Sequence, residues 1–230
     1  MGLFGIGKGK KKGQGQGKGG SLPEVYDEAD VEALDAHITK YFGASEKVFH
    51  EIVSPDIHLD VYICDPTEER PYYTLVTHGA GAHRMNLPDE VEGQLPDRAE
   101  VLITLPKDWD INSSDENWYW PIRSLKDCAR LPITYDTWIG YGHTVTSPER
   151  EPYGGSGFTG LMITFPLMFE PESFTCNLPG GNNVVFYQIM PLYGDEMDYK
   201  LENDAEALED LFGDDIPFVL DINRKSIISG

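Results

Sequence analysis

The sequence lacks any hydrophobic run long enough to cross a membrane. No apolar stretch approaches the ~20 residues that a spanning helix requires. No apolar segment of the signal-peptide type follows the basic residues near the N-terminus either. We therefore expect no transmembrane segment and a cytoplasmic location.

Cysteine is scarce as well. The three cysteines, Cys64, Cys128 and Cys176, are odd in number, scattered along the chain and set among apolar neighbours. This distribution favours buried free thiols in a reducing compartment over a disulfide framework. A chain of 230 residues can bury about 70% of its unfolded surface, so it does not need disulfides to fold.

Basic residues are few outside the N-terminus. Five of the 18 lysines and arginines are lysines within the first 20 residues, a stretch that holds no acid. The rest of the chain therefore carries 13 basic and 39 acidic side chains, a formal charge of −26. Such a field repels a phosphate backbone, which argues against nucleic-acid binding, and it attracts a basic partner. Solubility alone would also account for the charge.

Several catalytic signatures are missing. Phe158 stands where a nucleophile elbow requires its second glycine, and the segment Gly79–Arg84 lacks the last glycine of the dinucleotide-binding fingerprint. The sequence contains no phosphate-binding loop, no His-Glu-x-x-His and no Cys-x-x-Cys. It thus predicts no cofactor, no preset metal site and no enzymatic activity.

The chain begins with a stretch rich in glycine, lysine and glutamine, residues 1–20. This composition cannot bury enough apolar surface to offset the entropy of ordering. We expect a disordered tail over residues 1–22 and a single domain over residues 23–230.

Strand patterns occupy the centre of that domain. Tyr72–Thr77 and Ala99–Leu105 consist mainly of β-branched, aromatic and leucine residues, which suit buried strands. Residues 57–63 alternate between apolar and polar side chains, as a strand with one buried face does. Residues 158–165 and 184–190 are apolar enough to be interior strands.

Apolar residues recur at helical spacing in three segments. These are residues 27–42, residues 121–132 and residues 195–211, where Asn203-Asp204 is a potential break. Residues 218–222 predict a closing strand. Because strands and helices mix without a repeating βαβ period, the pattern predicts an α+β domain with a mixed sheet.

An ordered set of motifs resembles the suppressor-of-fused domain over roughly residues 45–226. No single motif is diagnostic, but the ordered set is a strong signal. The motifs are Tyr-Tyr-Thr-Leu-Val-Thr-His-Gly at 72–79, Ala-Glu-Val-Leu-Ile-Thr-Leu-Pro-Lys-Asp-Trp at 99–109, Trp-Pro-Ile-Arg-Ser-Leu-Lys-Asp-Cys-Ala-Arg-Leu-Pro at 120–132, Trp-Ile-Gly-Tyr-Gly-His-Thr at 138–144, Gly-Phe-Thr-Gly-Leu at 157–161, Phe-Tyr-Gln-Ile-Met-Pro-Leu at 186–192, Glu-Met-Asp at 196–198 and Asp-Ile-Asn-Arg at 221–224.

The resemblance implies the fold of the family's first lobe, a mixed, mostly antiparallel β-sheet packed with about three helices. Animal members of the family hold a transcription-factor peptide as an added strand between two lobes, and this chain resembles the first lobe only. Bacterial relatives have been proposed, from gene context, to be immunity proteins that block toxin domains, and a single lobe favours a bacterial member. We therefore expect a non-enzymatic module that sequesters a protein or peptide through a sheet edge or an acidic groove. A basic toxin domain is one such partner.

The candidate partner site lies on two segments, the loop Gly79–Pro96 and the turn Gly142-His143-Thr144. Both contain glycines that permit close backbone approach, and both lie near the ends of expected central strands. The family's peptide groove maps to the same neighbourhood. Alternatively, the glycines only form turns and the polar residues are only solvated. The candidate partner-binding residues are His78, His83, Arg84, Asp89, Asp97, Gly142 and His143.

A second hypothesis is a hydrolase or metal-dependent enzyme. It would use His78, His83 and His143 together with a carboxylate of Glu196 or Asp198, and it rests only on histidines in glycine-rich turns. The alternative for these histidines is a satisfied hydrogen-bonding role at strand ends.

Overall fold

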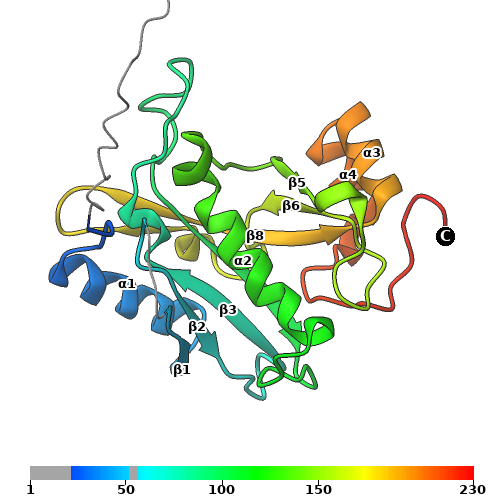
Figure 1. Cartoon of the computed structure of the whole chain (residues 1–230), viewed down its shortest axis with the longest axis horizontal. Coiled ribbons are helices and arrows are strands. Elements are labelled where there is room, and N and C mark those ends of the chain that lie inside the picture. The colour runs from blue at the N-terminus through cyan, green and yellow to red at the C-terminus, as the bar shows by residue number, and fades with distance from the viewer. Residues whose placement is uncertain (1–21, 52–55) are drawn as a thin grey trace, which may run out of the picture.

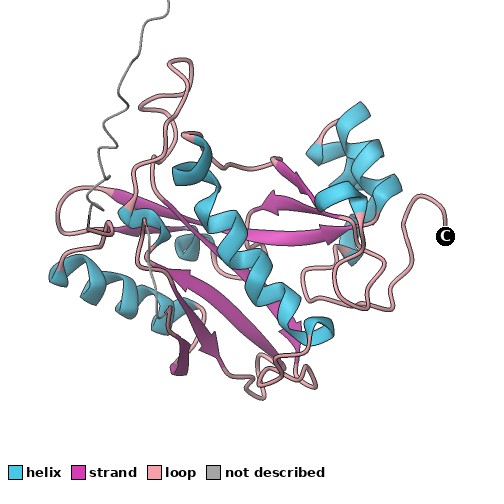
Figure 2. Cartoon of the chain, viewed as in Figure 1, coloured by secondary structure: helices cyan, strands magenta, loops and turns pink. Residues whose placement is uncertain are grey.

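The computed structural model describes residues 22–51 and 56–230. The predicted tail, residues 1–22, therefore lies almost entirely outside the described residues. In the described part, the chain forms a mixed β-sheet with helices on both of its faces (Figures 1 and 2).

The sheet has eight strands. Seven follow the order β1-β2-β3-β4-β8-β6-β5, and β7 pairs with β8 beside this path. β4 and β8 run parallel, whereas the other paired strands run antiparallel. This arrangement confirms the predicted fold class. The strands are β1 (Ser45–Phe49), β2 (Asp60–Cys64), β3 (Tyr72–His78), β4 (Ala99–Pro106), β5 (Thr144–Thr146), β6 (Gly160–Thr164), β7 (Thr175–Asn177) and β8 (Asn183–Leu192).

One face of the sheet packs against α2 (Glu116–Tyr135), which crosses in front of the sheet in Figure 1. Val101 and Ile103 of β4 point to this helix and pack with its buried residues, among them Trp120 and Leu125. Because side chains of a strand alternate between its two faces, the odd-numbered residues of β4 belong to this core and Leu102 does not.

The opposite face is covered by α1 (Glu28–Tyr41) and by a helical pair, α3 (Gly194–Glu202) and α4 (Ala205–Phe212). α1 packs on the cluster that contains Leu102, and the helical pair packs on the cluster that contains Met162 of β6. In Figure 1, α1 lies at the left of the molecule and the α3–α4 pair at the right.

The second helix is longer than its sequence pattern predicted. α2 begins at Glu116 rather than at Pro121, because Asp115 caps it by accepting a hydrogen bond from the N–H of Asn117 at 2.9 Å. The helix also continues through Pro132 to Tyr135. The predicted boundaries were therefore wrong at both ends.

The third predicted helix is divided in two. Asn203 leaves the helical conformation after α3, and Asp204 then caps α4 by accepting a hydrogen bond from the N–H of Ala207 at 2.8 Å. The break falls at the predicted Asn-Asp pair. Four α-helices in the described residues thus replace the expected three.

Two smaller expectations have opposite outcomes. The buried free thiols are confirmed, since all three cysteines are buried and free. The prediction of a closing strand over residues 218–222 is wrong, because this segment makes only an isolated bridge from Val219 to Thr104. It is held there because the N–H of Leu220 donates to the Thr104 carbonyl at 2.9 Å, and the Phe218 carbonyl accepts from the Gln188 amide at 2.7 Å.

Candidate functional site

The strand β5 forms one edge of the sheet and directs backbone groups outward. Residues on either side of it bond to the β6 segment: the carbonyl of His143 accepts a hydrogen bond at 2.8 Å, and the N–H of Ser147 donates one at 3.0 Å. Backbone groups of an edge strand alternate in direction, so those of Val145 also face β6. The N–H and C=O groups of Thr144 and Thr146 consequently face away from the sheet, where another strand can pair with them.

A cavity of about 480 Å³ opens beside this edge. Its walls come from the C-terminal turns of α2, the segment 137–145, β6 and α3, which lie far apart in the sequence. Apolar side chains make up most of the lining. The lining residues are Leu131, Tyr135, Thr137, Trp138, Ile139, Gly142, His143, Thr144, Val145, Ile163 and Lys200. An open sheet edge beside a side-chain cavity is the arrangement that recognises peptides by strand addition, because the backbone supplies affinity and the cavity supplies selectivity.

His143 lies in the wall of this cavity, edge-on to the Trp138 ring at a centroid distance of 4.2 Å. Burial lowers the pKa of its imidazole, and the positive charge of Lys200 lowers it further, against a smaller opposing effect of a hydrogen bond with the Trp138 backbone. His143 is therefore neutral at pH 7. It offers a hydrogen-bonding ring rather than a charge.

Gly142 is required by the backbone at the start of this edge. Its φ of +78° lies in the left-handed region, which glycine adopts without strain. A Cβ atom at this position would also approach the Cβ of Ala205 in α4 to 3.2 Å. Gly142 thus shapes the cavity wall, and its role in the turn accounts for the glycine without any partner.

The loop that carries Arg84, Asp89 and Asp97 protrudes from the molecule near the top of Figure 1. Arg84 is exposed, and its Nε donates to a carboxylate oxygen of Asp97 at 2.5 Å. Asp89 is exposed in the following turn. These three residues are therefore accessible, but Arg84 and Asp97 already satisfy each other.

The same loop contacts the segment that leads to the cavity. The N–H of Asn86 donates to the carbonyl of Thr137 at 3.1 Å, and the N–H of Ile139 lies 3.5 Å from the sulfur of Met85. The structure thus places the first predicted segment beside residues 136–139, which precede the second predicted segment, although the contacting residues are about 50 positions apart in the sequence.

The glycines after β3 serve an internal carboxylate. Glu100 is fully buried in β4, and its oxygens accept hydrogen bonds from the N–H groups of Gly79, Ala80 and Gly81 at 2.9, 3.3 and 3.0 Å. The hydroxyls of Tyr26 and Thr77 donate to the same carboxylate at 2.9 and 2.6 Å. Sequence reasoning missed Glu100, and the only available signal was a lone acid within an otherwise apolar strand.

His78 and His83 also have internal partners. His78 is 8% exposed, lies stacked on the Tyr62 ring at 4.9 Å and has its Nε2 3.5 Å from a carboxylate oxygen of Asp35. The Nδ1 of His83 lies 3.1 Å from the carboxylate of Glu24. His78 is therefore part of the scaffold, whereas His83 is half-buried beside the protruding loop.

The enzyme hypothesis required three histidines and a carboxylate to converge. The three histidines instead have separate neighbours. His143 contacts Trp138, His78 stacks on Tyr62, and His83 lies beside Glu24. The proposed carboxylates are engaged as well: Glu196 binds Arg224, and Asp198 binds Arg150. In the described ranges 22–51 and 56–230, no group of three or more His, Cys, Asp and Glu side chains could hold a metal ion.

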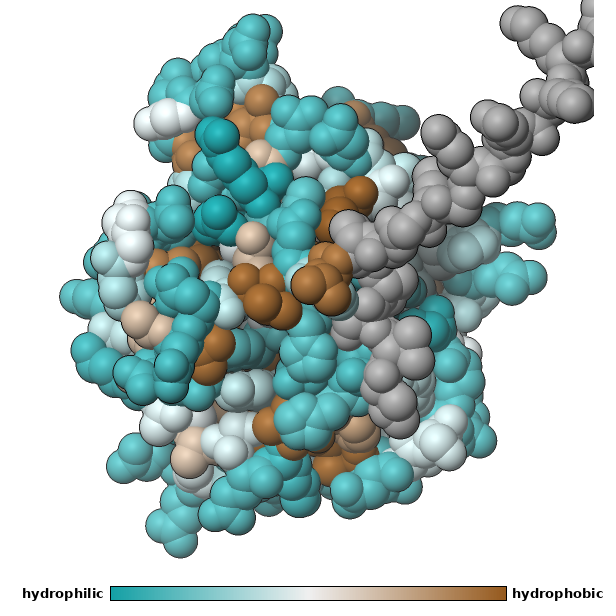
Figure 3. Space-filling view, turned by 60° about the vertical axis from the view of Figure 1, so that its left-hand side comes forward, coloured by the Kyte–Doolittle hydropathy of each residue, from teal (hydrophilic) through white to brown (hydrophobic). Residues whose placement is uncertain are grey.

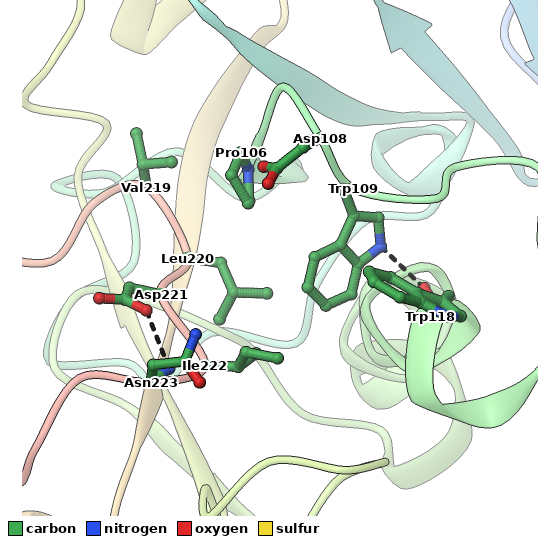
Figure 4. Close-up of a pocket in the computed structure, with 9 residues that line it drawn as sticks. All are labelled: Pro106, Asp108, Trp109, Trp118, Val219, Leu220, Asp221, Ile222 and Asn223. Atoms are coloured by element: carbon green, nitrogen blue, oxygen red, sulfur yellow. Dashed lines mark hydrogen bonds between the residues drawn. The ribbon is translucent and has the colours of Figure 1, made fainter.

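A second cavity of similar volume lies between the end of β4, the start of α2 and residues 219–223 (Figure 4). Trp109 is 4% exposed, and its indole N–H donates to the carbonyl of Trp118 at 2.9 Å. Leu220 points toward the Trp109 ring (Figure 4). None of the candidate partner-binding residues lines this cavity.

The surface is mainly polar on the face shown in Figure 3, where hydrophobic residues lie in separate groups among hydrophilic ones. Within the described part of the chain, no helix is both long and apolar enough to cross a membrane.

Comparison with protein families gives one match over most of the chain. The model of the suppressor of fused protein family matches residues 55–225. Among curated proteins, the uncharacterized protein UU111 of Ureaplasma parvum serovar 3 is 23% identical over 208 residues, which cover 88% of this chain and 98% of that protein.

Solved structures show the same fold. A suppressor of fused homologue from Neisseria gonorrhoeae FA 1090 has a TM-score of 0.62 at 20% identity, covering 87% of this chain and 98% of its own. The structure of the Sufu–Fu complex gives 0.59 at 16% identity, with coverage of 90% and 94%. Drosophila suppressor of fused gives 0.54 at 16% identity over 87% of this chain, which spans 50% of the Drosophila protein.

Proposed function

This chain belongs to the suppressor of fused protein family, and from that premise we propose that it is a non-enzymatic module that binds a protein partner through the edge strand β5. The observation that carries the proposal is the outward-facing backbone of Thr144 and Thr146 beside an apolar cavity. The Sufu–Fu complex supports it as a case of a similar fold that assembles with another protein.

The contact residues in this proposal come from both predicted segments. Gly142 and His143 contact the partner at the cavity. Arg84, Asp89 and Asp97 contact it from the neighbouring loop, together with His83 at the base of that loop. The buried His78 supports the site from within the scaffold.

The charge of the chain guides the choice of partner. Outside the first 20 residues the formal charge is −26, so a basic protein is attracted from a distance. We propose a basic toxin domain as such a partner, with this chain acting as its cytoplasmic immunity protein. The three buried free thiols fit a reducing compartment.

The substitution Thr146→Pro tests the strand-addition proposal. Proline removes an outward N–H without removing a hydrogen bond to β6, so the fold remains and pairing with an added strand is lost. The control is Thr146→Val, which keeps both the N–H and the β-branched side chain. Affinity capture from the native cell, followed by mass spectrometry, should recover a protein with wild type and Thr146→Val but not with Thr146→Pro.

Recovery of the same proteins by wild type and by both variants, with circular dichroism spectra that do not differ, would refute binding at β5. Recovery of an acidic partner would refute the toxin assignment but leave strand addition intact.

A further inference from the structure

We propose that the cavity beside β5 selects a partner strand that carries a carboxylate, and that Lys200 is the residue that binds it. This inference rests on the proposed function, because it concerns the chemistry of the partner at the same edge. It adds a specificity-determining residue that was not among the candidates from the sequence.

Lys200 lies half-buried on α3 and lines the cavity. In the part of the chain that the structure describes, its ammonium has no ion-pair partner and no hydrogen-bond acceptor. A lysine ammonium that no acid of its own chain pairs with can form a charge-assisted hydrogen bond with a carboxylate from another molecule. A carboxylate entering the cavity would supply the counter-charge.

The acids four positions before and after Lys200 in the sequence have other partners. Glu196, four residues before it, is fully buried and bound by both terminal nitrogens of Arg224, at 2.5 and 2.6 Å. Asp204 lies beyond the end of α3 and caps α4 through the N–H of Ala207. Positions four apart along one helix face each other, and on α3 that position is Glu196, which is paired with Arg224 rather than with Lys200.

Two further acids near this end of the sheet are also engaged. Glu209 of α4 accepts hydrogen bonds from the hydroxyls of Tyr141 and Thr164, each at 2.8 Å. Asp198 forms a two-point ion pair with Arg150, at 2.6 and 3.0 Å. The ion pair neutralises Asp198, whereas Glu209 keeps its charge and is held toward the two hydroxyls; in the described residues neither acid forms an ion pair with Lys200.

The lining makes that charge effective. Most of the other lining residues are apolar or aromatic, and charges interact more strongly in such surroundings than in water. His143 is neutral at pH 7 because burial and Lys200 itself lower its pKa. Lys200 therefore provides the positive charge of the cavity at neutral pH.

A carboxylate on the partner is compatible with the acidic body of the protein. The formal charge of −26 acts at long range and favours a partner that is basic overall. Salt screens interactions beyond about 8 Å at physiological ionic strength, so contact inside the cavity is decided by the groups there. The occupant that fits both is an extended segment of a basic protein, with a large apolar side chain in the cavity and a carboxylate beside it.

The test uses the full-length protein and defined peptides. Each peptide is a hexamer of threonine and valine with one phenylalanine, acetylated at its N-terminus and amidated at its C-terminus. In the first series, a single glutamate replaces each residue other than the phenylalanine, one position per peptide. The second series has glutamine at the same positions, and the third has glutamine together with a free C-terminal carboxylate. Titrations followed by NMR at the backbone amides of Thr144, Thr146 and Lys200 measure each dissociation constant.

We expect the dissociation constant of at least one glutamate peptide to be lower than that of its glutamine counterpart by a factor of about five or more. Tight binding in the third series instead would assign the carboxylate to a chain terminus. Lys200→Met should abolish the preference, and Lys200→Glu should reverse it. Lys107→Glu is the control, because it changes the net charge equally at an exposed position outside the cavity lining.

Equal binding of the three series to wild type would overturn the carboxylate proposal. If Thr146→Pro abolished that equal binding, strand addition at β5 would still stand. A preference for glutamate that survives in Lys200→Met would overturn the assignment to Lys200. If the amide signals of β5 did not shift with millimolar peptide, the proposal would also be overturned. The proposed function is tested separately, by the affinity capture with Thr146→Pro.

Discussion

At the scale of single residues, Glu100 determines the conformation of the chain that leads to the candidate site. Its carboxylate has five donors, three of them consecutive backbone N–H groups of the segment after β3. A Cβ at Gly79 would lie 1.9 Å from the carbonyl oxygen of His58, and one at Gly81 would lie 2.2 Å from the Tyr26 hydroxyl. Both glycines are therefore needed for the chain to wrap around this carboxylate.

The substitution Glu100→Gln should destabilise the fold by about 1–3 kcal/mol. The amide would keep the three bonds to one oxygen, but its NH₂ group would face the N–H of Ala80, which can only donate. Urea denaturation measures the loss. Glu90→Gln, at an exposed carboxylate, should change stability by less than about 0.5 kcal/mol. Equal stability of Glu100→Gln and wild type would show that the carboxylate does not hold the loop.

The sequence predicted single residues unevenly. Buried cysteines and the glycine turn at Gly142 were readable, because apolar neighbours and glycines report local requirements. Glu100 and Lys200 were not, because an acid in a strand and a lysine in a helix usually face solvent. Their roles depend on groups that are distant in the sequence.

At the scale of elements, β5 combines a short edge with an adjacent cavity. The strand has only three residues, which limits uncontrolled pairing with other chains. Three residues also offer few backbone hydrogen bonds to a partner. Selective binding at this edge therefore depends on the cavity formed by α2, α3 and the segment 137–145.

The break between α3 and α4 provides a prediction at this scale. Asp204→Ala removes the N-cap of α4 and should cost about 0.5–2 kcal/mol in thermal or urea unfolding. Asp210→Ala, an exposed acid within α4, is the matched control and should stay within about 0.5 kcal/mol of wild type. A loss no greater than that of the control would mean that Asp204 does not define the start of α4.

Elements were predicted best where their pattern was local. Residues 27–42 gave α1, and the strand runs at 72–77 and 99–105 gave β3 and β4. The start of α2 was missed because Asp115 stood in a loop-like acidic stretch, so Pro121 was taken as the first turn. The parallel pairing of β4 with β8 had no sequence signal, since strands about 80 residues apart meet only through the packing of the whole sheet.

At the scale of the whole molecule, two cores on one face and a third on the other hold the candidate site on a rigid sheet. α1 and the α3–α4 pair cover one face in separate clusters, and α2 covers the other. The cavity lies where the last turns of α2 and the side of α3 meet the β5 edge. Fold class and family followed from the sequence because motif order reflects the overall topology. The cavity did not, because its walls come from four elements.

Amide hydrogen exchange at β5 tests the central claim most directly. The measurement compares the free protein with its complex with the partner recovered by wild type and lost by Thr146→Pro. Strand addition predicts that the N–H groups of Thr144 and Thr146 exchange more slowly in the complex, while that of Val145, already bonded to β6, changes little. Unchanged exchange at Thr144 and Thr146, with new protection elsewhere on the surface, would contradict the claim that β5 is the binding edge.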